Sequence, residues 1–220
     1  MKIIKIIDAL YIDKSGVQAK TKNGRYQTVH LQQGDLDGAC AVYSTIMILI
    51  MIRAVSYNDI KVSGNDYDKR YSIEKLKKEM LETKGLHRDG NFFFHQDYDN
   101  IKEMLERTYS KQISVVHKEG NSVENIQKQI ENNQPVLISF GFKGGGAHAL
   151  VAVGIECDEK SNKPTKILCL DPGYPTPKFT YWNSVIDLTE YEGKYNYRNI
   201  TESGECNYIQ LQDILIISKR

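Results

Sequence analysis

The segment DGACAVYSTIMILIMIRAV, residues 37–55, constrains the fold more than any other part of the chain. It is long, apolar and free of internal proline, which is typical of a helix. Asp37 stands where an N-cap is expected, so Cys40 would be the third helical residue. Because apolar side chains lie nearly all round this helix, we expect it to be buried inside the protein.

The remaining segments predict strands and three further helices. Asn23-Gly24 is a strong hairpin signal between alternating polar and apolar residues. The other helices are expected at residues 72–84, from about Asp97 or Asp99, and at 121–134. Strands are expected at 2–13, 16–31, 112–118, 135–143, 147–159, 165–173 and 206–219. A hairpin, then a helical block, then mostly antiparallel strands predicts a segregated α+β protein.

The length and the absence of internal repeats favour one domain over residues 1–220, because 220 residues can enclose one well-buried core. We divide this domain into an N-terminal hairpin at 1–31, a helical part at 37–133 and a sheet part at 135–218. The segment most similar to a linker between these parts is residues 56–71, and residues 189–205 are expected to form a loop.

The charge balance excludes some classes of partner. Lys and Arg number 29 against 28 Asp and Glu, a formal net charge of +1. This balance predicts binding to neither nucleic acid nor an anionic membrane. No apolar run approaches the roughly 20 residues of a membrane helix. The N-terminal segment lacks the cleavage site of a signal peptide, so we expect a cytoplasmic protein, or one exported without a cleavable signal peptide.

The four cysteines have spacings typical of neither a zinc site nor a disulfide framework. We therefore expect separate thiols, no metal and no cofactor. Cys40 differs from the other three because it lies near a helix N-terminus. The helix dipole and a nearby imidazolium both lower the pKa of a thiol and make it a nucleophile. The alternative is that Cys40 is a small buried core residue.

His148 and Asp171 are the candidate partners of Cys40. His148 begins a predicted strand, and Asp171 ends the next, 23 residues later. An antiparallel hairpin would bring both to the same end, where a carboxylate orients an imidazole. Their alternatives are a structural histidine and the first residue of an Asp-Pro-Gly turn. The other four histidines resemble ordinary surface residues.

Two further features predict contacts with a substrate. Gly144, Gly145 and Gly146, followed by Ala147, allow a peptide to approach the backbone closely. Gln32 or Gln33 lies before the Cys40 helix, where a side-chain amide and the Cys40 backbone N–H could hold an oxyanion.

The motifs QGDLDGACAVYSTIMIL, HALVAVGIE and LCLDPG together resemble the papain-like cysteine peptidase superfamily, closest to its bacteriocin-processing, double-glycine-leader branch. The resemblance implies a papain-like α+β fold whose buried nucleophile helix packs on a mostly antiparallel sheet. It implies that Cys40 is the nucleophile, His148 the general base and acid, Asp171 the orienting residue and Gln33 the oxyanion donor. Ala41 departs from the family's usual glycine, and residues 56–117 and those after 180 do not align.

The expected reaction is acyl transfer from a peptide or protein substrate through a Cys-His-Asp triad, without a cofactor. Hydrolysis would make the chain a cysteine peptidase, and an effector or toxin would fit a compact enzyme of this kind, with an immunity or inhibitor protein as a further partner. Two alternatives stay open. One is a glutamine deamidase or transglutaminase-like enzyme on the same fold, and the other is a papain-fold module that binds peptides without catalysis.

Overall fold

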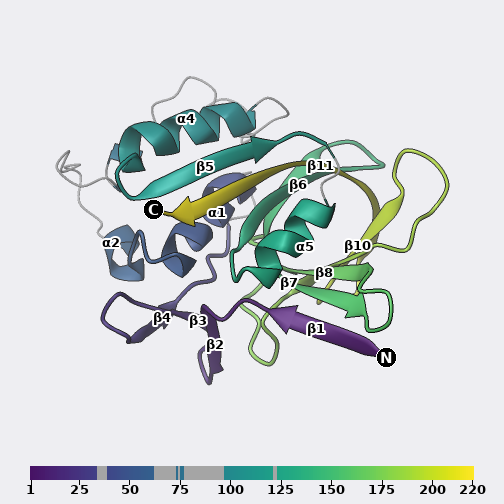
Figure 1. The fold of residues 1–220 in the computed structure, drawn as a ribbon, viewed down its shortest axis with the longest axis horizontal. Helices are drawn as coiled ribbons and strands as arrows, with labels where there is room; N and C mark the ends of the chain where they lie inside the picture. The colour runs from purple at the N-terminus through teal and green to yellow at the C-terminus, as the bar shows by residue number, and fades with distance from the viewer. Residues whose placement is uncertain (34–38, 62–72, 74, 77–96, 121–122) are drawn as a thin grey trace.

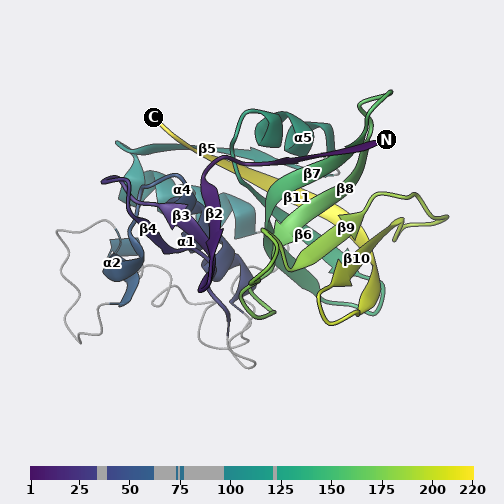
Figure 2. The same cartoon turned by 90° about the horizontal axis from the view of Figure 1, so that it is seen from below.

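The largest unit of the protein is an antiparallel sheet that closes on itself. A computed structural model describes residues 1–33, 39–61, 73, 75–76, 97–120 and 123–220. Six strands pair in a ring: β6 (Val136–Phe142), β7 (Ala147–Asp158), β8 (Pro164–Leu170), β9 (Ser184–Asp187), β10 (Tyr197–Thr201) and β11 (Cys206–Lys219). β11 pairs back onto β6, so the six strands form a closed barrel, seen on the right of Figure 2.

The expected papain-like α+β fold, a buried nucleophile helix packed on a mostly antiparallel sheet, is therefore wrong. The described residues are mostly β-structure, with a closed six-strand antiparallel barrel and few helices. The short strands β9 and β10 account for the difference, because they bridge β8 to β11 and close the ring. β10 lies within residues 189–205, which were expected to form a loop. Short strands with polar residues give too weak an alternation to be recognised.

Two long strands extend beyond the barrel. β7 pairs with β6 over Ala147–Ala152, with β8 over Val151–Cys157, and with β1 (Lys2–Ile6) over Gly154–Asp158. β11 likewise carries β5 (Ile113–Lys118) on its C-terminal half. The pairing of β11 with β6 is interrupted between Leu211 and Ile214 by an irregularity of the β-bulge type.

The apolar helix predicted around Cys40 is present as α1 (Cys40–Met51) and is buried from Ser44 to Met51. It packs against β6 and β7, and Figure 1 shows it beside the barrel. The helix begins at Cys40, with Ala39 as N-cap and without a side-chain cap. Cys40 is thus the first helical residue and not the third, and the expected cap, Asp37, lies outside the described residues.

A smaller sheet and further helices belong to the described fold. Residues 2–13 divide between β1 of the large sheet and β2 (Leu10–Asp13), which pairs with β3 (Gly16–Lys20) and β4 (Tyr26–Thr28). The Asn23-Gly24 hairpin is confirmed between β3 and β4. The helices are α2 (Tyr57–Lys61), α4 (Asp97–Tyr109) and α5 (Val123–Glu131), the last two as predicted. Most of the helix expected at 72–84 lies outside the described residues, and no described helix is long and apolar enough to cross a membrane.

Candidate active site

His148 stands near the start of β7, where neighbouring aromatic rings hold its imidazole. It lies opposite Phe140 of β6 in the register. The ring centroids of Phe140 and Phe142 are 5.7 and 6.4 Å from that of His148. Its side chain is mostly buried, so the ring has little freedom to turn. The strand pairing and these two rings therefore fix the direction in which the imidazole nitrogens point.

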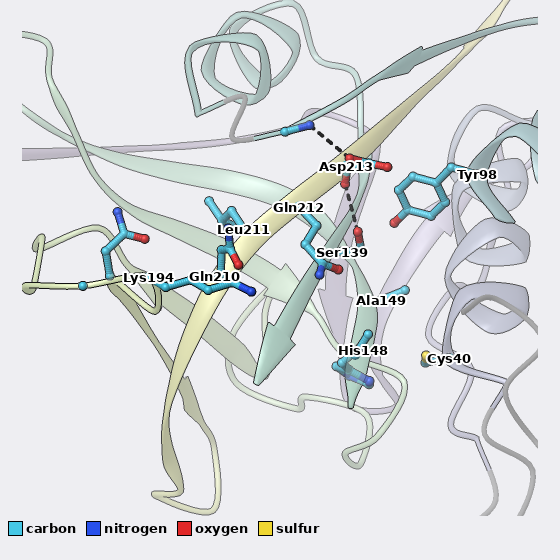
Figure 3. A pocket seen from close by; sticks show the side chains of 14 residues that line it. Cys40, Tyr98, Ser139, His148, Ala149, Lys194, Gln210, Leu211, Gln212 and Asp213 are labelled. Carbon is cyan, nitrogen blue, oxygen red and sulfur yellow. Dashed lines mark hydrogen bonds between the residues drawn. The ribbon is translucent and has the colours of Figure 1, made fainter. Parts of the chain in front are cut away.

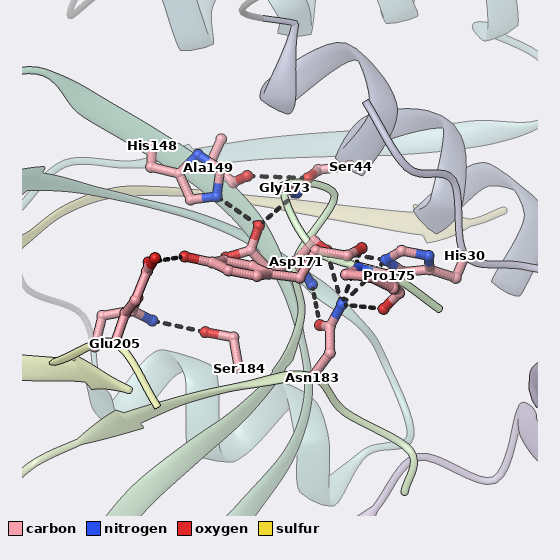
Figure 4. Close-up of polar contacts among 12 residues, drawn as sticks. His30, Ser44, His148, Ala149, Asp171, Gly173, Pro175, Asn183, Ser184 and Glu205 are labelled. Carbon is pink, nitrogen blue, oxygen red and sulfur yellow. Dashed lines mark hydrogen bonds and ion pairs between the residues drawn. The ribbon is translucent and has the colours of Figure 1, made fainter. Parts of the chain in front are cut away.

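Asp171 follows the last residue of β8 and contacts the same imidazole. The Nε2 of His148 lies 2.6 Å from Oδ1 of Asp171, whose side chain is only 1% exposed (Figure 4). The predicted proximity of these two residues is confirmed, since β7 and β8 pair as an antiparallel hairpin. Oδ1 also accepts a hydrogen bond from the Gly173 backbone N–H at 2.8 Å, which holds the carboxylate within its turn.

The backbone of Asp171 is held by two side chains that the sequence did not indicate. The Asp171 N–H donates to Oδ1 of Asn183 at 2.7 Å, and Nδ2 of Asn183 donates to the Asp171 carbonyl at 2.9 Å. Asn183 Nδ2 also donates to the Pro175 carbonyl at 3.0 Å. His30 Nε2 lies 2.9 Å from the same Asp171 carbonyl, and its Nδ1 lies 3.0 Å from Thr176 Oγ1. Asn183 and His30 together fasten the turn that carries the carboxylate.

The expectation that His30 is a surface residue is wrong. His30 is buried, and burial lowers its pKa, although its contact with Asp171 acts in the opposite direction. His117 is also largely enclosed, between Asp99 and Asp213. His87 and His95 lie outside the described residues. A buried neutral histidine near Asp171 is suited to a structural contact and not to carrying a second charge.

Cys40 lies beside His148 at the N-terminal end of α1. Ser44, one turn further along α1, donates to the Ala149 carbonyl of β7 at 3.2 Å and so holds the helix against the strand. Burial opposes ionisation of the Cys40 thiol, but a hydrogen bond with His148, the charge of His148 and backbone hydrogen bonds with Ala149 and Ala41 outweigh it. The pKa of Cys40 is therefore lowered from its ordinary value.

The pKa of His148 is raised, whereas that of Cys40 is lowered. Burial disfavours its charged form, but the charge and hydrogen bond of Asp171, and then those of Cys40, raise the pKa of His148 to about 10. A thiol with a lowered pKa beside an imidazole with a raised one favours the thiolate–imidazolium pair. That pair is the reactive form of a cysteine nucleophile.

The other three cysteines have different surroundings. All four cysteines are free. Burial raises the pKa of Cys157 and that of Cys169, which both belong to the hydrophobic core. Cys206 is exposed at the start of β11. The lowered pKa of Cys40 therefore contrasts with the raised pKa values of Cys157 and Cys169.

Gln33 lies near His148 and the turn that follows Asp171. Its backbone N–H donates to the Pro172 carbonyl at 2.9 Å. A methyl group placed on Gly173 would lie 3.8 Å from Cε1 of His148 and 3.9 Å from Nε2 of Gln33, so the three groups are close neighbours. Gln32 is exposed. Gln33 is thus the glutamine near the site. Its predicted role toward an oxyanion stays a prediction, because the segment that joins it to Cys40 includes residues 34–38, outside the described part.

Two cavities meet at His148. The larger, of about 450 Å³, is lined by Cys40, His148 and Ala147, with walls from α4, β6 and β11 (Figure 3). The smaller, of about 260 Å³, is lined by His148, Asp171 and Gln33.

The glycine run was predicted to contact the substrate, and the structure gives it a local role as well. Gly144, Gly145 and Gly146 form the exposed turn between β6 and β7, with positive φ angles at Gly145 and Gly146. None of the three lines either cavity, whereas Ala147 lines the larger one. A contact between the glycine run and a substrate stays a prediction.

Comparison with known proteins identifies the family. A family model described as the Peptidase_C39 like family matches residues 23–203, which include Cys40, His148 and Asp171. No curated protein matches the chain. The match does not distinguish the bacteriocin-processing branch from others, so that narrower placement stays a prediction.

Proposed function

Because the chain belongs to the Peptidase_C39 like family, which indicates a cysteine peptidase, we propose that it cleaves a peptide or protein amide bond through a Cys40–His148–Asp171 triad. Cys40 is the nucleophile, His148 the general base and acid, and Asp171 the residue that orients the imidazole. One observation carries the proposal. The buried Asp171 carboxylate contacts the His148 imidazole, which in turn contacts the Cys40 thiol of lowered pKa at the N-terminus of a buried helix.

The contacts support a different partner for each nitrogen of the His148 imidazole. Asp171 binds Nε2 of His148, which leaves Nδ1 for the thiol. A buried carboxylate in this place holds one tautomer of the ring and stabilises the imidazolium, without taking the proton itself. Asn183 and His30 act one step further away, as positioning residues that hold the Asp171 backbone.

The reaction follows from the thiolate–imidazolium pair. The Cys40 sulfur attacks the amide carbonyl carbon, and the carbonyl electron pair moves to oxygen. The tetrahedral intermediate collapses, the C–N bond breaks and His148 gives its proton to the leaving amine. The now neutral His148 takes a proton from water, and the resulting hydroxide releases the acid and the thiolate. The Cys40 backbone N–H, in the first helical turn, and the Gln33 amide are the proposed oxyanion donors.

The test is an assay on a mixed peptide library, with products identified by mass spectrometry. Wild-type protein is expected to give pairs of fragments that together equal one substrate plus water. Cys40→Ser and His148→Ala are both expected to abolish these products, whereas the exposed Cys206→Ser is expected to retain them. Intact peptides in which glutamine has become glutamate, or carries an added amine, would favour a deamidase or transglutaminase instead. Cleavage by both Cys40→Ser and His148→Ala would refute the triad.

A further inference from the structure

The two cavities that meet at His148 differ in which triad members they contain. Cys40 and His148 both line the larger cavity, whereas the smaller one is lined by His148 and Asp171 but not by Cys40. In the proposed reaction the acyl group is bonded to the Cys40 sulfur, and the leaving amine departs past His148. The larger cavity therefore belongs to the acyl side of the scissile bond, and the smaller cavity to the side of the leaving amine.

An interruption of strand pairing shapes the wall of the larger cavity. β11 and β6 are in register up to Leu211 and resume at Ile214, so Gln212 and Asp213 stand outside the regular pairing. Both residues line the cavity (Figure 3). Bulges of this kind re-aim side chains and are frequent next to active sites. Here the bulge places a carboxylate in the same cavity as Cys40.

Hydrogen bonds hold the Asp213 carboxylate in position, and it can still accept further ones. Oδ1 accepts the Gly120 N–H at 3.0 Å, and Oδ2 lies 3.2 Å from Nε2 of His117. The other nitrogen of His117 lies 2.8 Å from Asp99. An ionised carboxylate offers about four acceptor sites, so two contacts leave Asp213 able to accept more. Its side chain is 27% exposed, so a ligand in the cavity can reach it.

Two hydroxyl groups accompany this carboxylate. Ser139 of β6 donates its single proton to the Asp213 carbonyl at 3.2 Å, and its oxygen keeps a free lone pair. Tyr98 of α4 is only 6% exposed, and its hydroxyl meets the geometry of a hydrogen bond with no described residue. Ser139 is its polar neighbour and opposes the rise in the Tyr98 pKa that burial causes. Both side chains line the cavity. An unsatisfied buried hydroxyl is costly without a ligand and gains a partner with one.

Few other charged groups compete for this region. Among the described lining residues, the only other charged side chain besides those of the catalytic pair is Lys194. Its ammonium lies over the Tyr195 ring, 5.6 Å from the centroid. The Cys40 thiolate and His148 imidazolium cancel one another. Asp213 is therefore the negatively charged group on the part of the wall that also carries Ser139 and Tyr98.

From this arrangement, and resting on the proposed function, we propose that the larger cavity binds a lysine side chain on the acyl side of the scissile bond. An ammonium group has three N–H donors and no acceptor. Asp213, Ser139 and Tyr98 present three oxygen acceptors on the cavity wall. A cavity of about 450 Å³ lies within the usual range for ligand pockets. Specificity for lysine follows from the charge of Asp213. An apolar side chain of equal length would give that carboxylate no hydrogen bond beyond those with Gly120 and His117.

The test measures how fast blocked dipeptidyl chloromethyl ketones alkylate Cys40. In this reaction the sulfur–carbon bond forms as chloride leaves, so no natural substrate is needed. Probes carry lysine, norleucine or glutamate, either next to the ketone or one residue further away. Each rate is divided by the rate of the same variant with iodoacetamide, which has no side chain to bind. The readout is the normalised ratio of lysine to norleucine.

We expect a ratio of about tenfold or more in favour of lysine at one of the two positions in the wild type. Asp213→Asn is expected to bring the ratio close to one, and Ser139→Ala to lower it severalfold. Asp8→Asn is the matched control. Asp8 lies in the turn after β1, is 73% exposed, and its carboxylate contacts the Lys5 ammonium. This control is expected to keep the wild-type ratio.

The outcomes separate this inference from the function on which it rests. Rapid reaction of Cys40 with iodoacetamide, combined with equal lysine and norleucine rates at both positions, would overturn the lysine site alone. A wild-type ratio that survives both Asp213→Asn and Ser139→Ala would overturn it too, and Ser139→Ala decides the matter if Asp213→Asn does not fold. Slow reaction of Cys40 with iodoacetamide itself would overturn the proposed function, and the lysine site with it.

Discussion

Asn183→Ala tests whether the residues behind the proposed triad position the Asp171 carboxylate. The Asn183 side chain makes three hydrogen bonds of 3.0 Å or less, to the N–H and carbonyl of Asp171 and to the Pro175 carbonyl. A typical hydrogen bond contributes about 1 kcal/mol net, so the substitution is expected to lower the free energy of unfolding by about 3 kcal/mol. For a chain of this size that corresponds to a fall of roughly 6–12 °C in the melting temperature.

The stability change alone would not distinguish positioning from simple packing, so the pH profile of activity is the second readout. Asp171 raises the pKa of His148 to about 10 against the effect of burial. If the Asp171 turn moves, this support weakens and the pKa of His148 falls. The imidazolium then loses its proton at lower pH, and the alkaline limb of kcat/KM shifts to lower pH.

The assay compares wild type, Asn183→Ala and Asn132→Ala by thermal unfolding and by peptide cleavage from pH 5 to about 10.5. Asn132 is exposed in the turn after α5, so its variant is expected to match the wild type in both readouts. A destabilised Asn183→Ala enzyme with an unshifted alkaline limb would show that Asn183 supports the fold but does not position Asp171.

Two other substitutions test the site and the barrel. Asp171→Asn keeps the Asp-Pro-Gly turn but removes the charge that raises the pKa of His148, so we expect reduced kcat/KM and an alkaline limb at lower pH. Asp171→Ala is expected to be worse, and an alanine variant with wild-type activity and pH profile would make Asp171 a turn residue only. Gly154→Ala would place a methyl group 2.4 Å from Cδ1 of Ile6 and 2.9 Å from the Lys5 carbonyl, where β1 pairs with β7. Overpacking of this kind is expected to cost about 1–3 kcal/mol of unfolding free energy. Gly144→Ala, with nothing within 4 Å, is expected to cost less, and equal melting temperatures would refute the packing argument.

Sequence patterns succeeded where the relevant contacts are local or joined by a short turn. The burial of α1 follows from its composition alone, because a helix that is apolar nearly all round has no solvent face. The approach of His148 to Asp171 follows from one hairpin, because adjacent antiparallel strands bring the start of one beside the end of the next. These two inferences required no knowledge of the remaining sheet.

The closed barrel and the surroundings of the proposed triad could not be derived in the same way. Closure depends on β9 and β10, whose pairing joins segments that carry little periodic signal. His30 holds the Asp171 carbonyl across 141 residues, and a side-chain contact with a distant backbone atom leaves no pattern in the sequence. The bulge that exposes Asp213 is likewise a property of how β11 pairs with β6, invisible in the alternation of β11 alone.

The most direct test of the central claim, that Cys40 is an activated nucleophile, is the rate at which iodoacetamide modifies each cysteine at pH 6, followed by mass spectrometry. An ordinary thiol, with a pKa near ~8.5, is less than about 1% ionised at this pH. Cys206 is the stringent comparison, because it is exposed whereas Cys40 is half-buried. We expect Cys40 to react at least about tenfold faster than Cys206 and the two core thiols, and His148→Ala to remove this advantage. Modification of Cys206 as fast as Cys40, in a protein whose His148→Ala variant behaves identically, would contradict it.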